Sequence, residues 1–504
     1  MTPERERWIL GGKALRRLDG EWVLQDRDLR FDGNRIAEVA HPTSRHLRPG
    51  DIDARDRIII PGMVNAHVHS MDNFRRGMFD NMPLELYGLR KVPVAGSAPM
   101  SASALRVRTL LGGIESLLTG STSLIDDIWY ENTIDSDSIH TVMGAYEELG
   151  IRAWVTANLG DLPVTDIDPL LKESLDPNQY RVLAEAFTFD PDQALSICED
   201  ALERYNGPRS DGLVRFVMGA SGPQQCTEGF LQRIWEMARR WQVPVVSHLL
   251  ETRAQAITGE IRYGMTLVEY LHRLGCLDKH SLLVHGIWLT PSDVDLLSTS
   301  GATVIHCPTS NLRLGSGVCP VPALLNSGVN VALGTDSTST SDTQNLFLEL
   351  RLAGCLHAAE GPDYSNWVQP DDAFAMATLG GAAAVGQEGT LGEIEPGFKA
   401  DLVLLDENST AFAPLNDPVK NIVFAEYGQS VRAVIVDGRV VVEDGCLVTL
   451  DQQEIWREAR EHARHYFACN ESGFRSSDSL LPAFKEAYWR AQGHSWSPSR
   501  YIYG

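Results

Sequence analysis

The stretch PGMVNAHVHS, residues 61–70, places two histidines one residue apart at the end of an apolar run. In a β-strand, residues i and i+2 point to the same side, so His67 and His69 can face one common point. The spacing alone is weak evidence for a metal site, because the chain holds 14 histidines in 504 residues. The interpretation therefore depends on whether other strands bring further ligands to the same place.

The chain around this stretch alternates short apolar runs with amphipathic helical patterns from about residue 60 to 390. Strands that are apolar throughout and separated by helices indicate a parallel sheet covered on both faces. Eight such strands predict an α/β fold, a (β/α)₈ TIM-like barrel with its active site at the C-terminal ends of the strands. The predicted strands are residues 58–64, 121–126, 152–158, 214–220, 243–249, 281–286, 302–306 and 329–334.

The two ends of the chain have a different pattern. Asp-Gly turns between short β-rich runs occur before residue 60 and again after residue 390, and such turns are typical of hairpins. We expect residues 1–60 and 390–450 to form one small composite β-sandwich domain beside the barrel at 61–389. Residues 451–504 begin with a helical pattern and are expected to form a helical tail.

Charge and cysteine content restrict the partners and the compartment. The net charge is −23, from 44 basic and 67 acidic residues, which opposes binding to nucleic acid or to an anionic membrane surface. The N-terminus lacks the apolar stretch of a signal peptide, and no run of 18 apolar residues occurs. Eight cysteines without a CxxC pair are expected to be reduced thiols. We therefore expect a cytoplasmic protein with a small-molecule substrate.

Further polar residues follow the later predicted strands. His248 ends the fifth strand with Glu251 just after it, His285 ends the sixth, and Asp336 lies just past the eighth. Side chains at the C-terminal ends of barrel strands converge. Imidazoles and a carboxylate gathered there, with room for water, form a site for zinc or another divalent transition metal.

The order of these motifs resembles the amidohydrolase superfamily, in its branch of mononuclear aminohydrolases and chlorohydrolases. The stretches that carry the resemblance are PGMVNAHVHS, VVSHLLET, LLVHGIWLT, VIHCPTSNLRLGSG, GVNVALGTDS and GTLGEIEPGFKADLVLLD, which together span about residues 8–450. That branch includes methylthioadenosine/S-adenosylhomocysteine deaminases, guanine and cytosine deaminases, and triazine hydrolases. The resemblance implies a barrel with a β-sandwich from both chain ends.

The resemblance also implies a ligand set. By it, His67, His69, His248 and Asp336 bind one divalent metal ion per chain, commonly zinc and sometimes iron. Relatives with two metals carry a lysine on the fourth strand, and VRFVMGAS at 214–221 has none, so one metal is expected. Many relatives are oligomers, which implies a homo-oligomer here.

Three residues are the predicted catalytic groups. Asp336 takes a proton from the attacking water, Glu251 protonates a ring nitrogen of the substrate, and His285 hydrogen-bonds the attacking oxygen or polarises the carbon's substituent. The alternatives are that Glu251 is a solvated residue opening a helix and that His285 is a core histidine. The pair of carboxyl groups favours removal of an amino group.

Substrate contacts are predicted in three loops. The loop after the first strand resembles the RGxxDDxPLxxWL stretch of the deaminases and suggests Met71, Arg76 and Tyr87. The other candidates are Gln224, Gln225, Ser310 and Asn311.

Two departures from the nucleoside deaminases concern the pocket. KVPVAGSAPMSASAL lacks the glutamate that holds ribose, and ASGPQQCTEGF lacks the histidine of a PHAPYTCS-like stretch. We therefore expect methylthioadenosine and S-adenosylhomocysteine to be poor substrates.

The sequence thus predicts a metal-dependent hydrolase that removes an amino or substituted-amino group from a small nitrogen heterocycle or aromatic amine. The alternatives are dechlorination, hydrolysis of a cyclic amide or urea, and methylthioadenosine/S-adenosylhomocysteine deamination. A non-enzymatic binding barrel is disfavoured, because no ligand or proton-transfer residue is missing.

Overall fold

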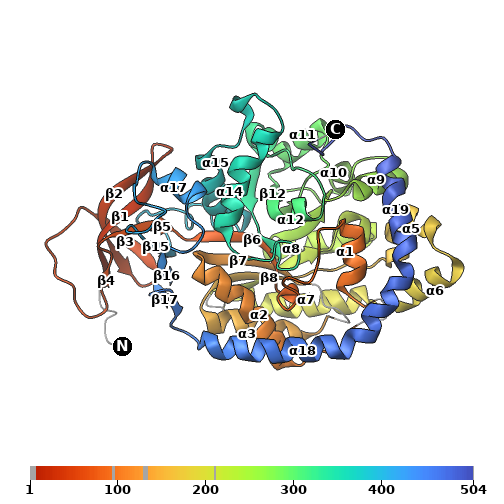
Figure 1. Ribbon diagram of the computed structural model, residues 1–504, viewed down its shortest axis with the longest axis horizontal. Coiled ribbons are helices and arrows are strands. Elements are labelled where there is room, and N and C mark those ends of the chain that lie inside the picture. The colour runs from red at the N-terminus through yellow and green to blue at the C-terminus, as the bar shows by residue number, and fades with distance from the viewer. Residues whose placement is uncertain (1–6, 94–96, 129–133, 209–211, 503–504) are drawn as a thin grey trace.

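The computed structural model describes residues 7–93, 97–128, 134–208 and 212–502. Two sheets organise these residues, a curled parallel sheet and a mixed sheet built by both chain ends (Figure 1). Parts of the predicted domains lie outside the described residues: residues 1–6 of the composite domain, residues 94–96 (in the KVPVAGSAP segment), 129–133 and 209–211 of the barrel, and residues 503–504 of the tail.

The parallel sheet forms the barrel. Its strand order is β13-β12-β11-β10-β9-β8-β7-β6-β14. β14 pairs with β6 at one edge and follows β13, the strand at the other edge, after two residues, so the curled sheet brings its two edges together. The strands are β6 (Met63–His69), β7 (Ser121–Ile128), β8 (Arg152–Ala157), β9 (Val214–Ala220), β10 (Val245–Leu249), β11 (Ser281–His285), β12 (Thr303–His306), β13 (Asn330–Leu333) and β14 (Asp336–Ser337).

The closure between β13 and β6 depends on two local features. The Asn65 side chain donates to the Thr335 hydroxyl and accepts from the Thr335 backbone N–H. Gly334 lies so close to β6 that a Cβ there would stand 2.8 Å from Cβ of His67. A side chain at 334 would therefore push apart the two segments that carry His67 and Asp336.

Helices surround the barrel strands (Figure 1). They are α1 (Leu84–Lys91), α2 (Ala102–Leu118), α3 (Ser136–Leu149), α4 (Val164–Ile167), α5 (Pro169–Ser174), α6 (Pro177–Ala186), α7 (Pro191–Asn206), α8 (Glu228–Trp241), α9 (Arg253–Tyr263), α10 (Leu267–Arg273), α11 (Pro291–Ser300), α12 (Pro308–Arg313), α13 (Val321–Asn326), α14 (Leu346–Leu356), α15 (Pro370–Ala375), α16 (Gly381–Ala384) and α17 (Pro418–Phe424). Many begin at a side-chain cap: Thr227, for example, accepts from the Phe230 N–H at the start of α8.

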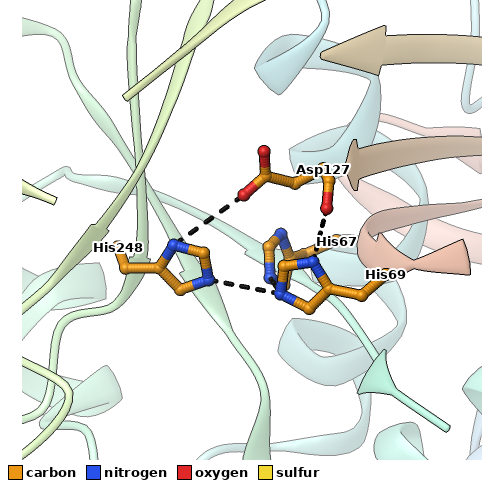
Figure 2. Close-up of side chains that lie close together, drawn as sticks. All are labelled: His67, His69, Asp127 and His248. Atoms are coloured by element: carbon orange, nitrogen blue, oxygen red, sulfur yellow. Dashed lines mark hydrogen bonds and ion pairs between the residues drawn. The ribbon is translucent and has the colours of Figure 1, made fainter. Parts of the chain in front are cut away.

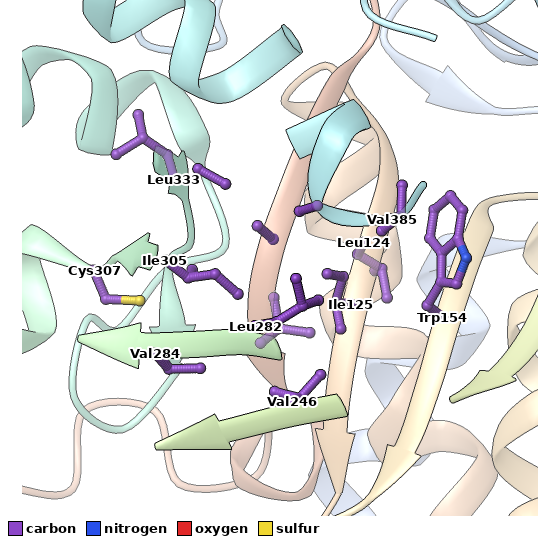
Figure 3. Close-up of a cluster of buried hydrophobic side chains, with 14 of the residues drawn as sticks. Leu124, Ile125, Trp154, Val246, Leu282, Val284, Ile305, Cys307, Leu333 and Val385 are labelled. Carbon is purple, nitrogen blue, oxygen red and sulfur yellow. The ribbon is translucent and has the colours of Figure 1, made fainter. Parts of the chain in front are cut away.

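The core of the barrel lies on both faces of the sheet (Figure 3). Leu124 and Ile125 are neighbours on β7 and point to opposite faces, yet both are fully buried. On β11, the neighbours Leu282, Leu283 and Val284 also point alternately to the two faces, and all three are buried. Burial on both faces explains why the sequence shows continuous apolar runs here instead of alternation.

The mixed sheet joins the two chain ends through antiparallel pairing of β5 with β15. Its strand order is β18-β17-β16-β15-β5-β1-β2-β3, with β4 beside β1. The strands are β1 (Arg7–Leu18), β2 (Glu21–Asp32), β3 (Arg35–Ala40), β4 (Ile52–Asp53), β5 (Arg57–Pro61), β15 (Leu402–Asp406), β16 (Val431–Val436), β17 (Arg439–Glu443) and β18 (Cys446–Leu447). The sheet encloses its own apolar cluster, which includes Ile9, Leu29, Ile59 and Leu402. The predicted α/β class, with a β unit from both chain ends, is confirmed.

The prediction of one strand at 58–64 is wrong. That segment is divided at Gly62 between β5 of the mixed sheet and β6 of the barrel. A Cβ at Gly62 would stand 2.2 Å from the Thr122 hydroxyl oxygen, so the glycine allows the chain to pass closely from one sheet to the other.

The C-terminal tail contains α18 (Gln452–Ser477) and α19 (Leu481–Gly493). Figure 1 shows α18 running beneath α2 and α3, and α19 rising along α5. Among the described residues, no helix combines the length and apolar character needed to span a membrane.

Candidate active site

Three histidines converge at the C-terminal ends of β6 and β10. Nε2 of His67 and Nε2 of His248 lie 3.2 and 3.3 Å from Nε2 of His69. His67 and His69 leave the same side of β6, as the period of a strand requires. Figure 2 shows the three rings pointing toward one another.

The outer nitrogens of two of these rings are held by the backbone. Nδ1 of His69 contacts the carbonyl oxygen of Asp127, and Nδ1 of His248 lies 3.0 Å from the carbonyl oxygen of Ser221. A carbonyl oxygen only accepts, so Nδ1 of each ring carries the hydrogen and Nε2 presents its lone pair. Burial, followed by the neighbouring His67, lowers the pKa of both His69 and His248 to about 4. Neutral rings with lone pairs directed at one point fit a shared divalent cation.

Two carboxylates lie near these rings. Asp127, His67, His69 and His248 each offer a ligand atom, and these atoms all lie within 4.8 Å of one another. Asp127, however, approaches His248 at Nδ1, at 3.8 Å, and its carboxylate accepts hydrogen bonds from Thr156 and Asn158. Asp127 therefore lies on the Nδ1 side of the His248 ring, away from the point where the three Nε2 atoms meet.

Asp336 lies on the inner side. Its Oδ1 is 3.6 Å from Nε2 of His67 and 3.4 Å from Nε2 of His69. Burial acts to raise its pKa, but the hydrogen bond with His67 and the surrounding imidazoles hold that pKa well below its usual value. Asp336 is thus the ionised carboxylate that faces the lone pairs of the histidines.

Glu251 and His285 face each other across the same cavity. Oε2 of Glu251 lies 3.5 Å from Nε2 of His285. Nδ1 of His285 donates to Oδ1 of Asn311 at 2.9 Å, which leaves Nε2 as the acceptor. Burial, then the negative charges of Asp336 and Glu85, raise the pKa of Glu251 well above its usual value. Its surroundings therefore favour the protonated form of Glu251.

A cavity of about 180 Å³ opens onto these groups. It is lined by His69, His248, Glu251, His285 and Asp336, together with Met71, Leu84, Tyr87, Lys91, Asn158, Ser221, Gln225, Gln255, Leu314, Ser337 and Thr340. Tyr87 is 3% exposed and its hydroxyl contacts Ser339. The structure thus places three of the predicted substrate contacts, Met71, Tyr87 and Gln225, on the wall of this cavity.

Four of the predicted substrate-contact residues lie elsewhere. Arg76 is exposed and forms an ion pair with Glu115, because the chain turns outward after Arg75, so it does not line the cavity. Ser310 donates to the Asp336 carboxylate and Asn311 holds His285, so both position other side chains. Gln224 lines an adjoining chamber of about 480 Å³.

Sequence reasoning missed Lys91 and Asp127. Lys91 ends α1 and its Nζ lies 2.7 Å from Oδ2 of the buried Asp72, while its side chain lines the cavity. Nothing in the sequence pattern placed this lysine at the barrel mouth. Asp127 follows the predicted second strand directly, and that strand-end position was the signal that could have found it.

Comparison with known proteins identifies the family to which this chain belongs. The Amidohydrolase family matches the chain over residues 58–441, which includes the histidines, Glu251 and Asp336. The chain belongs to the amidohydrolase family. This membership confirms the prediction of a hydrolase that acts on C–N bonds.

Individual relatives agree with the family assignment. A 5'-deoxyadenosine deaminase of Methanopyrus kandleri is 31% identical over 462 residues, covering 90% of this chain and 98% of the relative. A 5-methylthioadenosine/S-adenosylhomocysteine deaminase of Moorella thermoacetica is 32% identical over 408 residues, covering 81% and 87%.

Solved structures share the fold. A zinc-bound adenosine deaminase from Xanthomonas campestris has a TM-score of 0.80 at 26% identity, covering 92% of this chain and 99% of the other. A triazine hydrolase from Arthrobacter aurescens has a TM-score of 0.82 at 24% identity, covering 91% and 100%. The latter likeness establishes the fold alone.

Proposed function

We propose that this amidohydrolase is a mononuclear, metal-dependent aminohydrolase that removes an amino or substituted-amino group from a small nitrogen heterocycle or aromatic amine. The observation that carries the proposal is the pair of buried carboxyl groups at one cavity. The pKa of Glu251 is raised and that of Asp336 is lowered. Two carboxyl groups whose environments separate their pKa values in this way are suited to act as acid and base.

We assign the metal to His67, His69, His248 and Asp336. The Nε2 atoms of the three histidines and Oδ1 of Asp336 face one another, whereas Asp127 approaches a nitrogen already engaged by Ser221. Nitrogen and oxygen donors of this kind suit zinc, and Fe²⁺ is also compatible. One ion is proposed, because β9 carries no lysine to bridge a second.

A divalent metal held by these residues would lower the pKa of a water molecule toward neutrality and so supply a nucleophile at physiological pH. Asp336 accepts a proton from the attacking water. Glu251 delivers its proton to the ring nitrogen next to the carbon under attack, which lets that carbon become tetrahedral. Nε2 of His285, fixed as an acceptor by Asn311, orients the water by accepting its hydrogen bond. The proton on Asp336 then passes to the amino group, which leaves as ammonia or as a substituted amine, and the remaining hydroxyl proton restores Glu251 as the carbonyl group forms.

The same groups could displace chloride or open a cyclic amide, and these remain the alternatives within the class. The pair of carboxyl groups favours the aminohydrolase, because an amino group needs a proton in order to leave, whereas chloride does not. A barrel kept only for binding is disfavoured, since it would not require buried carboxyl groups with opposite pKa shifts.

We propose a cytoplasmic location and a homo-oligomeric assembly. The eight cysteines are all free, and five of them are buried, which fits a reducing compartment. The oligomer rests on the resemblance to the family alone.

The test is ammonia release from a panel of heterocyclic amines by zinc-loaded protein and its Glu251→Gln variant. Glutamine keeps the size of the side chain but cannot donate a proton as an acid, so turnover should fall roughly 10²–10⁴-fold while the metal is retained. Glu260→Gln, an exposed position on α9, is the matched control and should keep full activity.

The panel includes methylthioadenosine and S-adenosylhomocysteine, which we expect to be turned over weakly or not at all. A sugar hydroxyl without its charged partner loses about 1.5–3 kcal/mol. Full activity of Glu251→Gln would remove Glu251 from the mechanism. Efficient methylthioadenosine deamination, with kcat/KM of about 10⁴ M⁻¹s⁻¹ or more, would restore a nucleoside substrate.

A further inference from the structure

A second cavity adjoins the proposed reaction site. Its volume is about 480 Å³, against about 180 Å³ for the cavity at the histidines. The two share Tyr87, Lys91, Gln225 and Gln255 as walls. The two cavities therefore border each other along these side chains, and the larger one is the space next to a ligand held in the smaller one.

The walls of this chamber come from helices far apart in the sequence. Leu84 and Gly88 belong to α1, Leu171 to α5, Ala254 to α9, and Phe484 and Ala487 to α19. Figure 1 shows α19 standing beside α1, α5 and α9, and all three pack against it. Helix α19 lies beyond residues 58–441, so this wall is not part of the family match.

The wall is fixed and apolar. Phe484 and Ala487 are 8% and 4% exposed, and they join Leu89, Leu171 and Ala254 in a cluster separate from the barrel core. Tyr501 packs on Trp288, with ring centroids 5.1 Å apart, and the Val318 N–H donates to the Arg500 carbonyl oxygen at 2.8 Å. These contacts hold the chain beyond α19 against the barrel.

The charged groups around the chamber favour an uncharged occupant. The ammonium group of Lys91 is already paired with Asp72. Asp168 accepts from the Leu170 and Leu171 N–H groups at the start of α5. Burial raises the pKa of both Glu85 and Asp168, which disfavours their ionised forms.

We propose that the substrate carries an uncharged, apolar substituent on its aminated ring, and that Phe484 and Ala487 of α19 select this substituent. The inference rests on the proposed function, because it places the ring in the metal cavity. It gives the C-terminal tail a role in substrate specificity.

The experiment uses three ligands that share one ring: adenine, 9-benzyladenine and 9-(3-aminopropyl)adenine. Their affinities are measured by titration calorimetry on zinc-loaded protein with the Glu251→Gln substitution, so that turnover does not intervene. Burial of a phenyl group should make 9-benzyladenine bind at least about tenfold more tightly than adenine. Ala487→Leu, which fills the chamber, should reduce this advantage to less than roughly threefold.

Two further variants separate selection from misfolding. Glu486→Leu adds the same side chain at the neighbouring, exposed position and should keep the advantage of the benzyl group. Phe484→Ala removes part of the wall without filling the chamber and should also weaken 9-benzyladenine selectively. Adenine affinity is the internal measure of a folded site in every variant.

Three results would overturn the proposal: equal affinity for adenine and 9-benzyladenine, an advantage that survives both α19 substitutions, or tightest binding of the aminopropyl ligand. Failure of the proposed function has a different signature. In that case unsubstituted zinc-loaded protein would release no ammonia from any ring amine, while selective binding of the benzyl group persisted.

Discussion

At the scale of single residues, the site contains backbone that the rest of the fold must stabilise. His285 and Asp336 have φ values of 75° and 61°, in the left-handed region that non-glycine residues rarely adopt. Each such residue costs about 1–3 kcal/mol. His285 ends β11 and Asp336 begins β14, and both side chains line the cavity. Asn311 and Ser310 then fix these side chains by hydrogen bonds.

Glu349 stabilises the segment that contains Ser310 and Asn311. Its carboxylate accepts the Thr309 N–H at 3.1 Å, in the segment that carries Ser310 and Asn311. Burial raises its pKa to about 8. The folded protein therefore holds a proton that the unfolded chain releases near pH 4.5.

We predict that this proton makes the protein less stable as the pH rises from about 4.5 to about 8. Between these two pH values the free energy of unfolding falls by about 1.4 kcal/mol per pH unit. The stabilisation that this proton provides is complete only below the lower of the two pH values. Glu349→Gln imitates the protonated group and should remove this slope in urea unfolding measured at several pH values. Glu388→Gln, at an exposed position, should keep it. Parallel slopes in all three proteins would contradict the assignment.

At the scale of elements, the two sheets are held together by a buried ion pair. Arg152 at the start of β8 donates to Asp401 at 2.9 Å and to Asp437 at 2.7 Å. Arg152 and Asp401 are both nearly fully buried. The pair joins the N-terminal end of the barrel to the mixed sheet, away from the strand ends that carry the site.

We predict that Arg152→Met lowers the free energy of unfolding by about 3–5 kcal/mol, because it leaves Asp401 buried without its charged partner. The measurement is chemical unfolding, with exposed Arg439→Met as the control. A loss of less than about 1 kcal/mol would show that water or other groups replace the arginine.

The helices, strands and loops also show which features of the fold and of the site the sequence could predict. His67, His69, His248 and Asp336 lie at strand ends, and the strand ends of a parallel barrel converge, so periodicity predicted that they lie near one another. The choice of these four as ligands came from the resemblance to the family. Arg76 lies in a loop, whose direction no periodicity encodes, and it points outward. The division of 58–64 at Gly62 was also hidden, since both halves are apolar and both are buried.

At the scale of the whole molecule, residues more than 300 positions apart in the sequence adjoin one cavity system. Tyr87 and Lys91 follow the first barrel strand, whereas Phe484 belongs to α19. A contact of this range depends on the packing of α19 against α1, α5 and α9, which no local pattern determines. The chemistry of the site could therefore be inferred from the sequence, but the shape of its substrate pocket could not.

The central claim is that one metal ion, held by His67, His69, His248 and Asp336, is required for the removal of an amino group. The most direct measurement is a titration of metal-free protein with zinc, with ammonia release from a substrate found in the amine panel as the readout. We predict that activity rises linearly and levels off at one equivalent of zinc per chain, and that His248→Ala shows no such rise. A plateau at two equivalents, or ammonia release that does not depend on added metal, would contradict the account.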